Sequence, residues 1–241
     1  MMTAKVRRAR GSALVGMALL TCVALLAGGL AWRVALRTID ARLEQSLILT
    51  LRALETEIDR FRYLPRVAGQ DARITTTIRS PNDPLGIAAT NRYLEKVTAL
   101  AEASHLYLMN DEGITLAASN WALPESFIGS DYSFRPYFQQ AIETGIGAFY
   151  AIGVTTGTPG YFLAAKIEAG ADAGVVVVKV DLTPLERAWR AADLATAVVD
   201  PDGVVFLSGK PDWIYRPLAP LAPDVVARIG ADRAYTGVDL A

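Results

Sequence analysis

The pattern of apolar and polar positions begins with an uncharged run near the N-terminus. Residues 11–32 carry no charged side chain, and the ten residues before them hold four basic side chains and no acidic one. About 20 apolar residues span a bilayer as a helix, and preceding positive charge favours a cytoplasmic N-terminus. We therefore expect a cytoplasmic segment over 1–10, a transmembrane helix over 11–32 and an extracytoplasmic remainder. A cleaved signal peptide is the alternative, although its apolar core is normally shorter.

Residues 33–64 carry one amphipathic pattern. Apolar side chains recur at every third or fourth position, and no Gly or Pro interrupts them before Pro65. This spacing predicts a long helix with one apolar stripe, here called the stalk helix, that ends at Leu64-Pro65. The stripe either packs on its own domain or pairs with a second copy of the chain. Its members are Leu36, Ile39, Leu43, Leu47, Leu51, Leu54, Ile58 and Phe61.

Beyond residue 65 the pattern changes to short strands and short helices. The connections between successive strands are too short for parallel crossovers, so the fold class is α+β with an antiparallel sheet. The apolar run from Val175 to Val178 predicts a central strand covered on both faces. We expect residues 67–83 to be irregular. The expected helices are 85–103, 134–143 with Ser133 as N-cap, and 183–192 with a Thr cap, and the expected strands are 105–110, 114–119, 147–154, 161–168 and 175–180.

One pattern occurs twice. Residues 108–116 and 198–206 each read as a strand, a four-residue turn that ends in Gly, and a second strand. The matched context indicates a duplicated fold. The first copy is followed by about sixty residues that complete its sheet, whereas the second is followed by a short stretch only. We expect a membrane-distal ligand-binding domain over 65–192 and an incomplete membrane-proximal domain over 193–241.

Composition excludes several classes of function. The chain of 241 residues has 24 Lys and Arg against 25 Asp and Glu, which gives no basic face for nucleic acid. Its one histidine is His105 and its one cysteine is Cys22, so a Cys/His metal site or a histidine-based triad is not expected. A membrane-anchored hydrolase is therefore a poor hypothesis. We predict no catalytic residue and no metal site in this chain.

Residues 131–158 hold most of the candidate chemistry, and the pattern favours the binding of a small anion. Arg135 lies between aromatic residues and next to a proline, which is unusual for a solvated surface. Its planar guanidinium suits a bidentate contact with a carboxylate, although a surface salt bridge remains the simpler alternative. Lys179 interrupts an apolar strand, where a charge is costly unless it is paired. Lys179 is the second candidate cation, and Asp181, two positions on, shares its face if the strand continues.

Hydroxyl and backbone donors surround these cations in the sequence. Tyr132 and Tyr137 flank Arg135, although Tyr137 is equally explained as a core aromatic residue. The turn Thr155-Thr156-Gly157 offers hydroxyls and backbone N–H groups suited to an anion, or is an ordinary hairpin turn. The remaining candidates are Tyr150, Tyr161 and Ser119.

Four stretches resemble one known family. They are SNW (119–121), SFRPYFQQA (133–141), FYAIGVTTGTPGYF (149–162) and GVVVVKVDLTPLE (174–186). With the N-terminal span and the stalk helix they are similar to the periplasmic double-Cache, PAS-like sensor region of four-carbon-dicarboxylate sensor histidine kinases of the DctB type. The resemblance covers about residues 30–220.

The resemblance implies a function. It implies that succinate, fumarate or malate binds in the distal domain, with Arg135 and Lys179 each facing one carboxylate. It further implies a homodimer in the bacterial inner membrane and a periplasmic sensor. A cytoplasmic kinase outside this sequence would use ATP and phosphorylate a response regulator that controls dicarboxylate transport. Two alternatives keep the sensor: a chemoreceptor or other output, and a Cache domain that binds an amino acid, for which Asp181 would hold the ammonium group.

Overall fold

The structure is a computed structural model that describes the backbone of residues 2–240 and the side chains of 25, 26, 28–40 and 42–240. The chain divides into two compact units, Met1–Arg52 and Ala53–Ala241. Most of the predicted transmembrane span, 11–24 and 27, lies outside the described side chains. Within the described residues, no helix is both long enough and apolar enough to cross a membrane.

Four helices come first, and the strands follow with helices between groups of them. In chain order they are α1 (Met2–Arg62), α2 (Leu64–Gly69), α3 (Ala72–Arg79), α4 (Pro84–Ala101), β1 (His105–Asn110), β2 (Thr115–Ala118), α5 (Pro136–Thr144), β3 (Ile146–Ile152), β4 (Pro159–Ala169), β5 (Asp172–Val180), α6 (Thr183–Ala191), β6 (Ala197–Val199), β7 (Val205–Ser208), the 3-10 helix η1 (Pro211–Trp213) and α7 (Pro223–Asp232).

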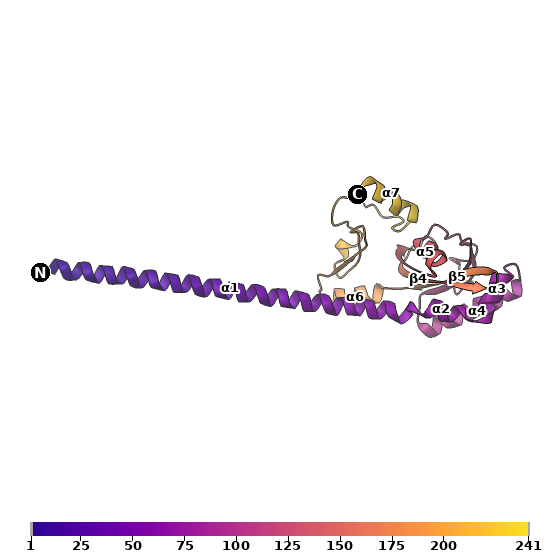
Figure 1. The fold of residues 1–241 in the computed structure, drawn as a ribbon, viewed down its shortest axis with the longest axis horizontal. Helices are drawn as coiled ribbons and strands as arrows, with labels where there is room; N and C mark the ends of the chain where they lie inside the picture. The colour runs from indigo at the N-terminus through magenta and orange to yellow at the C-terminus, as the bar shows by residue number, and fades with distance from the viewer. Residues whose placement is uncertain (1, 241) are drawn as a thin grey trace. The chain divides into compact units, whose positions relative to one another are not determined.

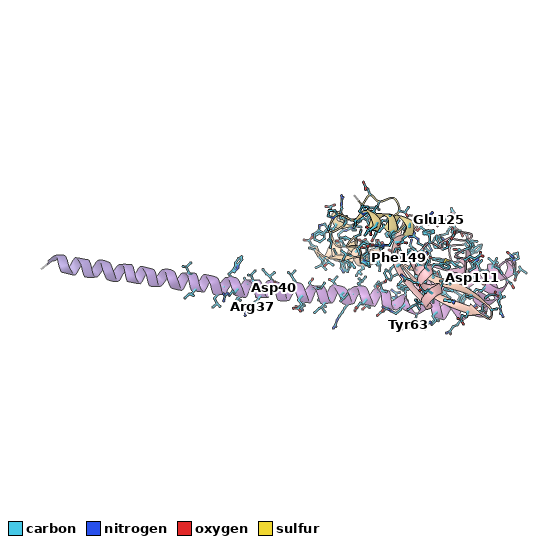
Figure 2. All side chains as sticks on the ribbon, turned by 45° about the horizontal axis from the view of Figure 1, so that its top comes forward. Arg37, Asp40, Tyr63, Asp111, Glu125 and Phe149 are labelled. Atoms are coloured by element: carbon cyan, nitrogen blue, oxygen red, sulfur yellow. The ribbon has the colours of Figure 1, made fainter. Side chains whose placement is uncertain are left out.

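The first unit consists of α1 up to residue 52. The side chains of Arg37 and Asp40 project from the helix (Figure 2). Five members of the predicted apolar stripe are also exposed there: Leu36, Ile39, Leu43, Leu47 and Leu51. The last residues of α1 belong to the second unit, where Leu54 and Phe61 are buried in its core. The break before Leu64-Pro65 confirms the predicted end of the long helix, since α2 begins there with proline in its first turn.

A five-stranded antiparallel sheet forms the centre of the second unit, with the strand order β2-β1-β5-β4-β3. In β5 the side chains of Val175, Val176, Val177 and Val178 are all 0% exposed, which confirms the predicted central strand. Helices α2, α3 and α4 lie along one side of the sheet and α5 lies on the other (Figure 1). The side chains of β5 therefore point alternately into two apolar clusters.

The structure corrects the prediction that residues 67–83 are irregular. They contain the end of α2 and all of α3. Asp71 caps α3 by accepting the N–H of Arg73, and Asp83 caps α4 by accepting the N–H groups of Leu85 and Gly86. A short polar side chain at an N-cap satisfies backbone donors that the first helical turn leaves free. The same residue types also favour turns, which is why this stretch resembled a loop.

Two predicted helix caps were wrong. Helix α5 begins at Pro136, with Arg135 rather than Ser133 at the N-cap position and no capping side chain. Helix α6 begins at Thr183 after Leu182, and the carboxylate of Asp181 accepts the Thr183 N–H at 2.8 Å. Arg135 itself has an extended backbone, with φ −77° and ψ 130°, directly before the first helical residue.

Both copies of the repeated pattern form hairpins, β1–β2 and β6–β7. In the first, the Asn110 side chain accepts two backbone N–H groups of the turn, and in the second Asp200 does the same. Gly113 (φ 89°) and Gly203 (φ 80°) close the two turns in the left-handed region. The second hairpin belongs to residues 193–240, here called the C-terminal module, which also contains η1 and α7.

Candidate functional site

A small cavity lies on the α5 side of the sheet. Its volume is about 10 Å³, which is about the space that one water molecule needs. Side chains from β1, the segment before α5, the β3–β4 turn, β4 and β5 enclose it. The lining residues are Tyr107, Phe127, Tyr132, Arg135, Tyr137, Gly153, Val154, Thr155, Phe162 and Lys179.

Lys179 reaches the cavity from the central strand β5 and is 1% exposed. Its ammonium group donates to Thr156 Oγ1 at 2.9 Å, to Thr158 Oγ1 at 2.7 Å and to the Thr158 carbonyl at 2.9 Å. Glycine is required under its stem, because a Cβ on Gly160 would lie 2.6 Å from Lys179 Cε. Burial lowers the pKa of Lys179 to about 8, and only Asp181 opposes this shift. The strand thus places a readily titrated cation beside the β3–β4 turn.

Arg135 approaches the same cavity from the N-terminus of α5 and is also 1% exposed. Its Nη2 donates to the Ile152 carbonyl at 2.8 Å. Its Nη1 donates to the carbonyls of Asp232 at 3.1 Å and Arg233 at 2.9 Å. Burial lowers the pKa of Arg135, but a guanidinium remains charged in proteins.

Neither buried cation forms an ion pair with a carboxylate of the described residues. In the described part of the chain, no carboxylate lies within 4.0 Å of the side-chain nitrogens of Arg135 or Lys179. None of the described residues that line the cavity is acidic. Buried charges in proteins are normally paired or bound to ions, because removing a charge from water is costly. Two unpaired cations on one cavity are therefore suited to an anion with more than one negative charge.

Hydroxyl groups complete the polar wall of the cavity. Tyr132 and Thr155 share a hydrogen bond of 2.6 Å, and Tyr107 donates to the Tyr137 hydroxyl at 2.8 Å. Burial raises the pKa of both Tyr107 and Tyr137, so both phenols stay protonated at neutral pH. Since Tyr137 accepts from Tyr107, its own proton is available for an acceptor inside the cavity.

The structure brings together some of the predicted site residues and separates others. Arg135, Lys179, Tyr132, Tyr137 and Thr155 line the cavity. Thr156 contacts the Lys179 ammonium, and Gly157 shapes the same turn with φ 64°.

Besides Thr156 and Gly157, four predicted residues are absent from the cavity wall. Tyr150 and Tyr161 lie on the other face of the sheet, where the Tyr150 ring packs 4.4 Å from Phe206. Ser119 accepts the Leu106 N–H, and the exposed Asp181 accepts the Thr183 N–H at the start of α6. The structure gives none of these four a place in the cavity wall.

The sequence reasoning missed the apolar side of the cavity. Tyr107, Phe127 and Phe162 line it and were not singled out. Phe162 pairs with Lys179 across β4 and β5, so the two side chains share one face. The alternation of side chains along a strand predicts which residues share this face only when the register between the strands is known.

The sheet order, the repeated hairpin and a cavity closed by the β3–β4 turn define a PAS-like sensor domain of the Cache type. A solved structure with this fold is the sensor domain of the Vibrio cholerae histidine kinase DctB. It superposes with a TM-score of 0.75 at 30% identity, over 82% of this chain and 77% of that one. The chain belongs to the family of DctB sensor domains.

Two curated relatives support the same assignment, whereas no family model matches the chain. The C4-dicarboxylate transport sensor protein DctB of Rhizobium meliloti is 36% identical over 192 residues, 79% of this chain. The protein of the same name from Pseudomonas aeruginosa is 33% identical over the same share. The match covers 30% and 31% of these two relatives, so this chain corresponds to under a third of their length.

Proposed function

We propose that this chain binds a four-carbon dicarboxylate, namely succinate, fumarate or malate, in the cavity between Arg135 and Lys179. The observation that carries the proposal is the pair of buried cations that form no ion pair with any carboxylate in the described part of the chain. A dianion would neutralise both, and each carboxylate would accept charge-assisted hydrogen bonds. The names of the curated relatives, sensors of C4-dicarboxylate transport, support this class of ligand.

The composition of the cavity favours a diacid over an amino acid. An amino acid needs an acidic side chain for its ammonium group, and Asp181 was the candidate for that role. Asp181 is exposed, and its carboxylate accepts the Thr183 N–H instead. The described cavity lining contains a second cation, Lys179, and no acidic residue.

For the whole protein we propose a membrane-anchored sensor histidine kinase. Its sensor would be periplasmic, its N-terminus cytoplasmic, and residues 11–32 would cross the bacterial inner membrane. A cytoplasmic part would bind ATP and phosphorylate a response regulator, and the chain would act as a homodimer. The support is the membership in the DctB family, together with the uncharged run over 11–32.

The test compares Lys179→Met with Lys166→Met by calorimetric titration with succinate. Methionine keeps the length of the lysine stem and removes the charge, and Lys166 is a lysine on β4 that does not line the cavity. We expect the wild-type chain and Lys166→Met to bind succinate alike. Lys179→Met should lose at least about 100-fold in affinity, because a buried hydrogen-bonded charge contributes roughly 3 kcal/mol.

The melting temperature without ligand separates a binding role from a structural one. A buried cation with no anion destabilises the ligand-free fold, so Lys179→Met should melt at the same temperature as the wild type or higher. A large fall in melting temperature would make Lys179 a structural residue. If succinate, fumarate and malate all fail to bind the wild-type chain at millimolar concentration, the proposal is wrong.

A further inference from the structure

We infer that helix α7 is part of the ligand site, because its C-terminal carbonyls position the Arg135 guanidinium. The inference rests on the proposed function and adds to it a route by which an occupied site affects the C-terminal module. It assigns to residues 229–234 a role that the sequence alone did not suggest.

The first step is that the Arg135 donors are divided between carbonyls at the end of α7 and one carbonyl of β3. Both N–H groups of Nη1 are occupied by the carbonyls of Asp232 and Arg233, and one N–H of Nη2 by that of Ile152. Of the five guanidinium N–H groups, the Nε–H and the second Nη2–H remain. These two N–H groups have no protein acceptor among the described residues and can donate to a carboxylate. Helix α7 therefore holds Nη1 of Arg135, while the Nε–H and one Nη2–H stay available for a ligand.

The second step is electrostatic. Asp232 is the last residue of α7 and Arg233 is its C-cap, in the left-handed region at φ 50°. The C-terminus of a helix carries partial negative charge and unpaired carbonyls, and cations are favoured there. A docked α7 thus offsets part of the free-energy cost of burying Arg135. No carboxylate of the described residues pairs with this guanidinium.

The third step is the continuity between α7 and the turn over the cavity. The N–H of Ile152 donates to the Ala234 carbonyl at 2.8 Å, while its own carbonyl accepts from Arg135. Gly153 and Val154, the next two residues, line the cavity. The Arg233 guanidinium lies 4.4 Å from the centre of the Phe134 ring, directly before Arg135. One short network of hydrogen bonds and ring contacts thus joins the cavity wall to the end of α7.

The coupling between ligand binding and the docking of α7 is positive. A docked α7 orients Arg135 for the dicarboxylate, so loosening α7 weakens ligand binding. Coupling between two binding events is reciprocal, so the dicarboxylate must strengthen the docking of α7 by the same factor.

The first experiment needs no ligand and uses hydrogen exchange of residues 229–234. Arg135→Lys keeps the charge but loses the planar fork that reaches two carbonyls at once. We expect about tenfold faster exchange of these amides in Arg135→Lys, and no change in Arg190→Lys, an exposed arginine on α6. Unchanged exchange in Arg135→Lys would overturn the link between Arg135 and α7, whatever the ligand is.

The second experiment measures succinate binding when α7 is loosened from a distance. Ile229 packs α7 into the core and is 6% exposed, whereas Val226 on the same helix is 47% exposed. We expect Ile229→Ala to weaken succinate binding about tenfold, with a smaller loss in Ile229→Val and less than about twofold in Val226→Ala. In the Arg135→Lys background the Ile229→Ala change should add no further loss, because the coupling is already broken.

The outcomes separate the two proposals. If Ile229→Ala and Ile229→Val speed exchange at residues 229–234 but leave the succinate affinity unchanged, α7 is not part of the site. If succinate does not bind the wild-type chain, the proposed function fails and the ligand coupling fails with it. The exchange result for Arg135→Lys would still decide the α7 link by itself. In the wild type, succinate should slow exchange at residues 229–234, and a faster exchange would reverse the sign and contradict the inference.

Discussion

At the scale of single residues, the notable feature is that two cations are buried beside an apolar wall. Arg135 satisfies three donors with carbonyls, and Lys179 satisfies its donors with two threonines. Hydrogen bonds of this kind lower the cost of burial but leave the charges uncompensated. Truncation of Arg135 would also leave the buried Ile152 carbonyl without its donor, so Arg135→Ala reports on both fold and ligand binding.

Lys179 makes ligand binding depend on pH in a predictable direction. Its pKa is about 8 because burial disfavours the ammonium form. A bound dianion favours that form and raises the pKa, so binding takes up a proton above about pH 8. Succinate affinity should fall by up to about tenfold per pH unit above pH 8. Calorimetric titration in buffers of different ionisation enthalpy would measure this proton uptake.

The ligand-free protein should show the opposite trend over the same window. The folded-state pKa of Lys179 lies below its ordinary value of 10.5, so the unfolded chain binds more protons between about pH 8 and 10.5. The free energy of unfolding should therefore rise with pH there, relative to Lys179→Met. His105 titrates outside this window, because burial lowers its pKa below 6.5.

For the ligand-bound protein, a succinate affinity that does not change with pH up to about pH 9.5 would contradict the assignment of Lys179 to the ligand site.

At the scale of elements, the β3–β4 turn controls access to the cavity. The turn is closed by hydrogen bonds of Gly153 with Thr158 and Gly157, and by the Tyr132–Thr155 pair. A cavity of about 10 Å³ cannot admit eight heavy atoms unless this turn moves. Opening of residues 153–158 should therefore precede succinate entry.

Thr155→Val removes the hydrogen bond between the turn and Tyr132. A neutral hydrogen bond contributes roughly 1 kcal/mol, so we expect amide exchange across 153–158 and the association rate of succinate to rise about fivefold. Stopped-flow mixing measures that rate. Thr144→Val is the matched control, because the Thr144 hydroxyl binds carbonyls at the end of α5, away from the cavity. If succinate associates with the wild-type chain at the diffusion limit, its entry needs no opening of residues 153–158.

The elements also show which parts of the fold could be predicted from the sequence. Turn chemistry predicted both hairpins, since Asn110 and Asp200 form the same turn before a glycine with positive φ. Helix α3 was missed because Asp71 and Asp83 favour turns as much as caps.

The assignment of residues to the two sheet faces depends on register, which the sequence does not reveal. Lys179 pairs with Phe162, whereas Tyr161 pairs with Val180 and Tyr150 with Tyr161. Neighbouring residues on a strand point to opposite faces, so Tyr150 and Tyr161 lie opposite the cavity. The two cations could be predicted from their chemistry, because charge in an apolar context is unusual at any register. The aromatic lining and the role of α7 could not, since both depend on contacts between distant segments.

At the scale of the whole molecule, the proposed homodimer makes a prediction about the first unit. In α1 the apolar side chains of Leu43 and Leu47 are 64% and 67% exposed. A helix of this length that leaves a regular apolar stripe in water is poorly stabilised, and pairing with the same stripe of a second copy would bury it. We therefore expect the full chain, in detergent or a lipid nanodisc, to be a dimer by sedimentation equilibrium.

Leu47→Lys tests whether the stripe holds that dimer together. The change removes two buried leucines per dimer, each contributing about 1.5–3 kcal/mol, and places two like charges near each other. The dimer dissociation constant should rise by at least about 100-fold. Glu44→Lys changes the charge at an exposed position off the stripe and should leave the dimer intact. Succinate binding should be unchanged in both variants, because Arg135 and Lys179 lie in the second unit and line a cavity within one chain. If the Leu47→Lys chain remains dimeric, the interface lies on another surface. If this chain becomes monomeric and also loses succinate binding, the partner chain must contribute to the site.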